Sequence, residues 1–563
     1  MSCRRSIGSY CRALFLPDFR VSASPCLVTQ TFLSEQVQQR KTFCPSTLRL
    51  IDQIDIMTND TLTFVGLAIS TTLVYFGASF LWKIYRVDSW ARASGISTHT
   101  HKPFLWGDAT VFKEPKMSHM TFFSLAKELG TIFFLRIVST PVLVIADPAT
   151  AQYVMTTRNF PKSSWVYKSL GGTAPTNLVG INKSEHKRIR RQIMPAFNIP
   201  FLKQQVPLIV DRSLLLMKRL EDLVGQDVDM SDWFHKTTLD VIGLLGFGYD
   251  FRLVETGDEG IRHMINRLIG LDGGTFLMID PTAFWRRNNF DKGYISQKQR
   301  FDEIAMELIR KGRRERDAGE TVDSEKFGRQ KEHPNILNLL VKTEFKNEEN
   351  PLTDQELIDQ IITFLFAGSE TSSHTLGFCI GYLSKDARVL AKLRAEIDAA
   401  LNSFQSPADI TYDTINSLKY LDCFIKETLR MTPIGTATVR ECDGDNEVIA
   451  GYRVPRGTWL LVSFYSMHHS KDLWTEPEKF WPERFEQETI EAEEAAGMKR
   501  HPYAFIPFAA GMTMAQIEIK IILVHFLRHF DWDPVKCDPS KFGGTITLKI
   551  DNCIIKLRKR AHA

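Results

Sequence analysis

One uncharged stretch constrains this chain more than any other feature of its sequence. Residues Thr61–Trp82 read TLTFVGLAISTTLVYFGASFLW and contain no Asp, Glu, Lys or Arg. At about 1.5 Å per residue, a helix of this length spans the roughly 30 Å hydrocarbon core of a bilayer. Asp60 precedes the stretch and Lys83 and Arg86 follow it, so the basic side faces the cytosol. The sequence predicts a transmembrane helix over 61–82; a buried core helix is the alternative.

Residues 1–56 do not fit with the part of the chain that follows them. They carry several arginines and few acids, which is compatible with a mitochondrial presequence. The simpler interpretation is a disordered leader of uncertain reality, because Met57 stands just before the apolar stretch. We therefore expect a leader at 1–56 and one folded domain at 83–563.

Composition excludes several classes of protein. With 563 residues, 44% of them hydrophobic, the chain can bury a large core. A net charge of +4 gives no electrostatic basis for binding nucleic acid. The nine cysteines form no CxxC or Cys/His cluster, so neither a disulfide framework nor a zinc site is indicated. A reduced, cytosol-facing domain fits this usage.

Local patterns predict a mainly helical domain with a small β-rich part. Ile132–Val138 and Val142–Ile145 are apolar and β-branched around a Ser-Thr-Pro turn, which predicts a hairpin. Asp147-Pro148 predicts a helix start with Asp as the cap. The charged segment Arg310–Lys331 contains glycines and is expected to be a solvated linker.

A further helix is expected after Gly511. Its apolar positions recur at intervals of three and four residues. These positions are Ile517, Ile521, Ile522, Leu523 and Phe526.

A long apolar helix should follow Thr353 and contains the sequence Ala367-Gly368-Ser369-Glu370-Thr371. The small Ala and Gly would let a ligand approach the helix backbone. The acid and hydroxyl that follow could relay protons beside that ligand. The alternative is that the small residues only pack against a neighbouring helix.

Three further motifs carry charge. Glu427 and Arg430 lie three residues apart on one helical face, as a routine surface pair would. Arg484, in Trp-Pro-Glu-Arg-Phe, could join them in a buried bidentate network. His186 and Arg190 share a face of a basic helix, which is a solvated surface unless an anionic partner binds there.

Taken in order, A-G-x-E-T, E-x-x-R, P-E-R-F and F-x-x-G resemble the cytochrome P450 family in its membrane-bound, fungal form, over about residues 83–560. The resemblance implies the mainly α P450 fold with a small β-rich part, preceded here by one transmembrane helix. It also implies that haem b lies between two long helices. Glu370 and Thr371 match the oxygen-activation pair, and Glu427, Arg430 and Arg484 match the structural ion-pair triad.

The resemblance further implies haem contacts at Arg190, His186, Ala367, Gly368, Arg440, Phe508 and Gly511. Arg190 and Arg440 match propionate-binding arginines, with His186 in place of the usual Trp. Phe508 matches the aromatic residue near the proximal sulfur. The substrate pocket would be lined from residues around 165–180, 270–290 and 433–438.

One departure from the family concerns the iron ligand. The family's loop reads F-x-x-G-x-R-x-C-x-G, but here Gly511 runs directly into Met512 and the next helix. A six-residue segment with the axial Cys and a propionate-binding Arg is missing, so this chain offers no metal ligand there. The thiolate pushes electron density onto iron and favours O–O cleavage. We do not expect replacement by Met512, Met514 or the cysteines at 379, 423, 442, 537 and 553.

The resemblance implies a haem-thiolate monooxygenase, provided that the gap is an artefact of the gene model. It would insert one oxygen atom of O2 into a hydrophobic small molecule, for which a secondary metabolite is expected. NADPH–cytochrome P450 reductase would be the partner, and the endoplasmic reticulum membrane the location, single-pass with the catalytic domain in the cytosol. Alternatives are a non-catalytic P450-like membrane protein and a haem protein that rearranges peroxides.

Overall fold

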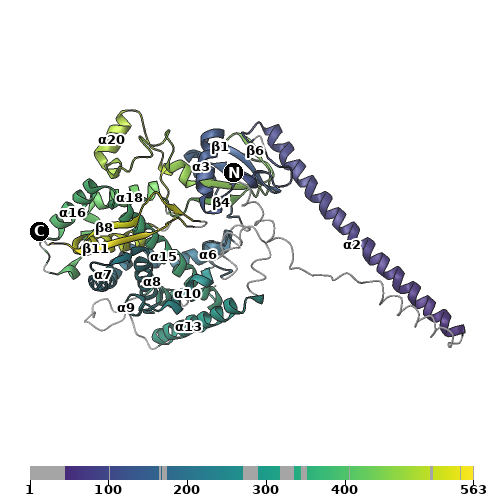
Figure 1. The fold of residues 1–563 in the computed structure, drawn as a ribbon, viewed down its shortest axis with the longest axis horizontal. Helices are drawn as coiled ribbons and strands as arrows, with labels where there is room; N and C mark the ends of the chain where they lie inside the picture. Colours follow the sequence, from purple (N-terminus) through teal and green to yellow (C-terminus); the bar gives the residue numbers. More distant parts are fainter. Residues whose placement is uncertain are drawn as a thin grey trace, which may run out of the picture. The chain divides into compact units, whose positions relative to one another are not determined.

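The computed structural model describes residues 45–99, 102–163, 167, 174–269, 289–317, 335–343, 351–402, 404, 406–507, 512–544 and 547–561. The chain divides into two units, Met1–Lys83 and Ile84–Ala563. The second unit is mainly helical, with small sheets (Figure 1).

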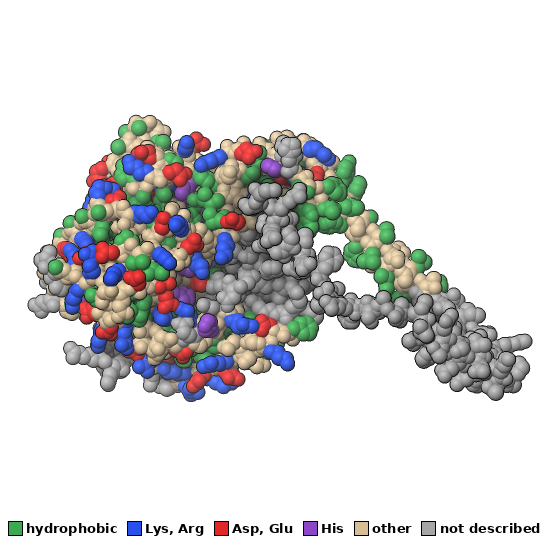
Figure 2. Space-filling model, in the orientation of Figure 1, with side chains coloured by type: hydrophobic (Ala, Val, Ile, Leu, Met, Phe, Trp, Pro, Cys, Tyr) green, Lys and Arg blue, Asp and Glu red, His purple; other side chains and the backbone are tan. Residues whose placement is uncertain are grey.

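Helix α2 (Pro45–Ser94) contains the predicted membrane-spanning segment. Its part Thr63–Ser94 is apolar and long enough to cross a membrane, and none of its most apolar window is buried. Hydrophobic side chains such as Phe64, Leu67 and Val74 are exposed along it (Figure 2). Residues 45–56 of the expected leader belong to this helix, and residues 1–44 lie outside the described residues.

Helices dominate the unit that begins at Ile84. They are α3 (Ser118–Leu129), α4 (Pro148–Gln152), α6 (Lys183–Ile193), α7 (Ile199–Glu221), α8 (Met230–Phe247), α9 (Leu253–Thr256), α10 (Glu259–Ile269), α13 (Lys292–Asp317), α14 (Ile336–Thr343), α15 (Asp354–Leu383), α16 (Ala387–Leu401), α17 (Tyr412–Ser417), α18 (Lys419–Met431), α19 (Phe464–His468), α20 (Gln487–Ala495) and α21 (Met512–His529).

Helix α15 is the central element of this unit and packs against α8, α13, α18 and α21. It begins with a capping box: the Glu356 N–H donates to Thr353 Oγ1 at 3.2 Å, and the Thr353 N–H donates to Glu356 Oε2 at 2.8 Å. The predicted helix start after Thr353 is thus confirmed. The prediction of an apolar helix after Gly511 is also confirmed, because all five of its apolar positions are at most 3% exposed in α21.

The β-rich part consists of small sheets. In the largest, β1 (Ile132–Ile137) pairs antiparallel with β2 (Thr140–Ile145), which confirms the predicted hairpin. Strand β7 (Trp459–Ser463) runs parallel to β2 and antiparallel to β4 (Ala437–Glu441). A second sheet has the order β3 (Asp227–Asp229), β11 (Cys553–Lys559), β8 (Phe530–Cys537), and two-stranded ladders join β5 (Glu447–Ile449) to β6 (Tyr452–Val454) and β9 (Phe542–Gly543) to β10 (Lys549–Ile550).

Two local predictions near these strands have opposite outcomes. Asp147 caps α4, accepting a bond from the Thr150 N–H at 2.7 Å, as predicted. The expected linker over 310–331 is wrong at its start, because α13 continues to Asp317. Arg, Lys and Glu favour helix, and Gly312 in this stretch is buried against Asn338 of α14. The remainder of that linker lies outside the described residues.

We predict that Gly243→Ala destabilises the protein. A Cβ there would lie 2.6 Å from the Tyr249 carbonyl oxygen and 2.5 Å from the Phe251 ring, at the C-terminal end of α8. We expect a loss of about 1–3 kcal/mol in the free energy of unfolding, measured by chemical denaturation. Gly246→Ala is the control, since its Cβ would meet only Ile242 Cδ1 at 3.7 Å. Equal stabilities of the two variants would contradict the steric argument.

Candidate functional site

The middle of α15 presents two different faces. Ser369 and Glu370 are buried, whereas Ala367 is exposed and Thr371 is partly exposed. The Thr371 hydroxyl donates to the Ala367 carbonyl at 2.7 Å, the i−4 arrangement typical of Thr in a helix. The face that carries the predicted hydroxyl therefore remains open to a ligand, and the acid beside it is enclosed.

Gly368 lies against helix α8. A Cβ on Gly368 would come within 2.9 Å of Ile242 Cδ1, so the missing side chain lets α8 and α15 approach. This is the packing alternative that the sequence left open for the small residues of this motif. The roles of Ala367 and Gly368 beside a cofactor remain predictions.

Glu370 has an unusual environment for a carboxyl group. Burial raises its pKa to about 7, while Lys549 and a bond from Thr547 act in the opposite direction. The Thr547 hydroxyl donates to Glu370 Oε2 at 3.3 Å. A carboxyl whose pKa lies near neutral pH can both hold and release a proton under physiological conditions.

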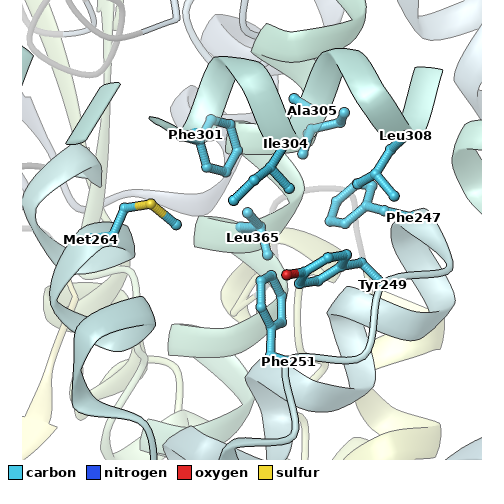
Figure 3. Close-up of a pocket in the computed structure, with 10 residues that line it drawn as sticks. Phe247, Tyr249, Phe251, Met264, Phe301, Ile304, Ala305, Leu308 and Leu365 are labelled. Carbon is cyan, nitrogen blue, oxygen red and sulfur yellow. The ribbon is translucent and has the colours of Figure 1, made fainter. Parts of the chain in front are cut away.

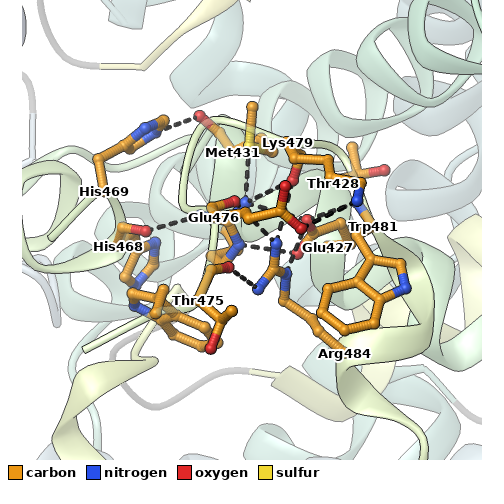
Figure 4. A network of polar contacts seen from close by, with 12 residues as sticks. Glu427, Thr428, Met431, His468, His469, Thr475, Glu476, Lys479, Trp481 and Arg484 are labelled. Atoms are coloured by element: carbon orange, nitrogen blue, oxygen red, sulfur yellow. Dashed lines mark hydrogen bonds and ion pairs between the residues drawn. The ribbon is translucent and has the colours of Figure 1, made fainter. Parts of the chain in front are cut away.

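The structure brings Glu427, Arg430 and Arg484 together, and all three side chains are fully buried (Figure 4). Arg430 binds the carboxylate through two nitrogens, with Nε at 2.7 Å from Oε2 and Nη2 at 2.9 Å from Oε1. Arg484 Nε donates to Oε1 at 3.0 Å, and so does the Trp481 N–H at 2.8 Å. One carboxylate thus joins α18 to the segment around Arg484.

Backbone carbonyls satisfy the remaining guanidinium donors of this network. Arg484 donates to the carbonyls of Thr475, Glu476 and Lys479 at 2.8, 3.2 and 3.1 Å. Arg430 Nη1 donates to the His468 carbonyl at 2.7 Å. Because these carbonyls belong to a largely irregular stretch, the two arginines hold its course where no sheet or helix ladder does.

Basic side chains from three parts of the chain meet without an acid. The backbone of Arg440 in β4 forms an antiparallel β-bridge with the backbone of Lys162. The pKa of Lys162 falls to about 8, first because of burial and then because of the charges of Arg440 and Arg190. The pKa of His186 falls to about 4 for similar reasons, with burial first and Lys162 next. Among the described residues, no ion pair with Asp or Glu is formed by these four side chains, which we call the basic cluster.

The basic cluster suits an anionic ligand. Arg440 donates through Nη1 to the Phe160 carbonyl at 3.0 Å, but its buried Nε has no partner within the described part of the chain. Lys162 Nζ is held by the carbonyls of Leu178 and Ile181 at 2.8 and 3.3 Å. Carboxylates, such as the propionates of haem, would both bond the free Nε and relieve the mutual repulsion.

The iron end of a haem site is not supplied by the described residues. Phe508–Gly511 lie outside them, and α21 begins at Met512. The described cysteines are all buried, and burial raises the pKa of Cys379 to about 12 and of Cys423 to about 11. Cys537 and Cys553 face each other across β8 and β11 with their sulfurs 3.1 Å apart. Thiols in such surroundings are poor metal ligands, so the described residues could hold the propionates of haem but supply no thiolate for its iron.

An apolar hollow lies elsewhere, between α8, α10, α13 and α15 (Figure 3). Ten side chains line it, and neither Glu370 nor Thr371 is among them. Of the three expected pocket-lining regions, 270–290 falls largely outside the described residues, and 165–180 is described at 167 and 174–180. In the third, the Thr438 hydroxyl lies 2.8 Å from the Tyr167 hydroxyl.

Sequence reasoning missed Lys162 and the importance of Glu518. Lys162 follows Phe160-Pro161 in no recognisable motif, and only the β-bridge to Arg440 brings it into the basic cluster. Glu518 of α21 is 2% exposed, and burial raises its pKa to about 8 beside Ser372 of α15. In the sequence, Glu518 is only an acid next to Ile517 in an apolar helix, and nothing there shows that α15 would enclose its carboxyl.

The sequence profile of the family described as "Cytochrome P450" matches residues 100–557. Mouse cytochrome P450 3A11 is 28% identical over 492 residues, 84% of this chain and 91% of its own length. Human cytochrome P450 3A7 is 28% identical over 508 residues, 84% and 91% of the two chains. The crystal structure of the heme domain of a cytochrome P450DA mutant has a TM-score of 0.71 at 24% identity and covers 83% of this chain and 98% of its own.

We predict that Glu370→Gln stabilises the protein above neutral pH but not at pH 5. The raised pKa means that the folded state holds the proton more tightly than the unfolded chain, so wild-type stability falls as pH rises from the ordinary value of 4.5 through about 7. Gln removes this loss, which reaches at most about 3 kcal/mol at pH 8. Thermal unfolding at both pH values measures the difference, with the exposed Glu488→Gln as control. A stabilisation independent of pH would contradict the assignment.

We also predict that Glu427→Ala is strongly destabilising. It leaves two fully buried guanidinium groups without their carboxylate, which costs roughly 3–5 kcal/mol of unfolding free energy. Asp413→Ala is the matched control, because its ion pair with Lys203 is exposed and contributes at most about 1 kcal/mol. Chemical denaturation compares the two, and a loss at Glu427 no larger than at Asp413 would refute the prediction.

Proposed function

Because the chain belongs to the cytochrome P450 family, we propose that it is a haem-dependent monooxygenase whose sequence, as given, lacks the segment that carries the axial cysteine. The reaction proposed is insertion of one oxygen atom from O2 into a hydrophobic small molecule. We propose a secondary metabolite as the substrate class, in keeping with the fungal-type resemblance of the sequence.

The basic cluster is the observation that carries this proposal. Burial and then the charges of neighbouring basic groups lower the pKa of Lys162 and of His186, and Lys162 faces Arg440 across a β-bridge. Among the described residues, none of the four groups of the basic cluster forms an ion pair with an acid. Such an arrangement costs stability unless an anion binds. We assign these side chains to the haem propionates, with Arg190 and Arg440 as the fixed charges.

When bound, haem supplies the chemistry of oxygen activation. In our proposal the chain's own groups manage protons beside it. Glu370 stores a proton near neutral pH and exchanges it, and the Thr371 hydroxyl, whose own proton is donated to the Ala367 carbonyl, offers its oxygen as an acceptor on the more exposed face. Glu427, Arg430 and Arg484 take no part in proton transfer and hold the surrounding backbone.

The proposed setting is the endoplasmic reticulum membrane. We propose that residues 61–82 anchor the chain, that residues 83–563 form the catalytic domain on the cytosolic side, and that residues 1–56 are a leader. Lys83 and Arg86 support this orientation. NADPH would supply electrons through a partner reductase, which donates them to the haem.

The second candidate is a P450-like membrane protein without catalytic activity. The observation that favours it is the sequence itself, which has no cysteine between Cys442 and Cys537. Transcripts across the Gly511 codon distinguish the two candidates. An in-frame insertion that encodes a cysteine supports the monooxygenase, and transcripts without it support the second candidate.

We predict that the chain with this sequence lacks the absorption band of a thiolate-ligated haem, in the reduced carbon-monoxide difference spectrum. A variant with a six-residue Cys-containing segment inserted between Gly511 and Met512 should show that band, because the sulfur ligand is then present. The same insertion with Ser in place of Cys is the control. A thiolate band from the unaltered chain, or none from the Cys insertion, would contradict the proposal.

A further inference from the structure

His468 connects the buried ion-pair network to the segment that precedes Phe508. It is the last residue of α19, and its side chain is fully buried. Its backbone carbonyl accepts a bond from Arg430 Nη1 at 2.7 Å. Figure 4 shows His468 at the edge of this polar network. On the other side, its ring nitrogen Nε2 accepts a bond from the Ile506 N–H at 3.3 Å. One residue therefore joins α18 to the backbone at Ile506.

Aromatic contacts hold the imidazole in this position. The ring of His468 lies 5.4 Å from that of Phe505, centroid to centroid. Phe505 in turn contacts Phe485 at 5.0 Å and Trp474 at 6.3 Å. Trp474 is itself fixed, because its indole N–H donates to the Met467 carbonyl at 3.1 Å. The rings leave the imidazole little freedom to turn away from Ile506.

The bond to Ile506 requires a neutral imidazole, since a protonated ring has no acceptor nitrogen. The surroundings favour that form: burial, then the charges of His469 and Arg430, lower the pKa of His468 to about 3. The ring thus accepts at every physiological pH. Within the described part of the chain, the backbone from Phe505 to Pro507 belongs to no helix or strand, so the bond at Ile506 supplies a polar link to the interior beside the ring contacts of Phe505.

From this geometry we propose that His468 is a positioning residue: by accepting the Ile506 N–H it fixes the backbone at Ile506 relative to α18 and the buried ion-pair network. The fixed end is the Glu427–Arg430 pair, because Arg430 holds the His468 carbonyl. The inference concerns the polypeptide alone. It goes beyond the proposed function, and it can be tested in protein that contains no haem.

Amide hydrogen exchange tests the proposal directly. The full chain is purified in detergent without haem, and exchange is followed by mass spectrometry with fragmentation that resolves the Ile506 amide. In the unaltered chain that amide should exchange at least tenfold more slowly than in an unstructured peptide. In His468→Phe, which keeps an aromatic ring but has no acceptor, it should exchange at least about tenfold faster than in the unaltered chain.

His469→Phe is the matched control. His469 is also buried, at 3% exposure, and stacks on Tyr465 at 4.2 Å, but its Nε2 bonds the Met431 carbonyl and not Ile506. It should leave the Ile506 amide within about threefold of the unaltered rate. Exchange of the α15 amides and the thermal midpoint show whether each variant keeps its global fold.

Several results would overturn the inference. One is an Ile506 amide that exchanges in the unaltered chain as fast as in a peptide. Another is equal exchange at Ile506 in His468→Phe and the unaltered chain, or equal acceleration in both Phe variants. If His468→Phe does not fold, His468→Gln decides, because its side-chain oxygen can accept the bond: retained protection supports the proposal, and peptide-like exchange overturns it.

Discussion

A single buried carboxylate holds together the irregular part of this protein. Glu427 lies between two fully buried guanidinium groups, and desolvating such charges is costly unless every donor finds a partner. The structure meets that condition with backbone carbonyls from His468, Thr475, Glu476 and Lys479. The arginines therefore act as a replacement for secondary structure, because they organise a stretch in which few backbone groups bond one another.

The basic cluster differs from this network because its charges have no acidic partner among the described residues. There, burial and then nearby basic charges lower the pKa of Lys162 and of His186, and the buried Nε of Arg440 has no partner among the described residues. A folded chain tolerates such repulsion where binding relieves it, and this contrast with the satisfied network around Glu427 is what supports a haem-binding role. Glu370 is likewise a buried ionisable group without an ion-pair partner in the described part of the chain, and burial raises the pKa of its carboxyl to about 7.

Local patterns predicted those parts of the fold that depend on neighbours in the sequence. The β1–β2 hairpin, the cap at Asp147 and the start of α15 follow from turn and capping chemistry, and α21 follows from its apolar spacing. The linker prediction at Arg310 failed because charged residues with high helix propensity form the last turns of α13, where Gly312 packs on α14. Of the candidate site, the motifs named Arg430 and Arg484 as partners of Glu427, but they did not show that Thr547 would bond Glu370.

By itself, the sequence determined the family resemblance, the apolar span within α2 and the lack of a cysteine between Cys442 and Cys537, since these are properties of residue order and composition. Only the tertiary structure decided which charges are paired. It brought Lys162 to Arg440 through a β-bridge, bonded the Arg484 guanidinium to the carbonyls of Thr475, Glu476 and Lys479, and set Gly368 against Ile242. The physical reason is that burial and pairing arise between segments far apart in the chain, and their energies depend on distances that no local pattern contains.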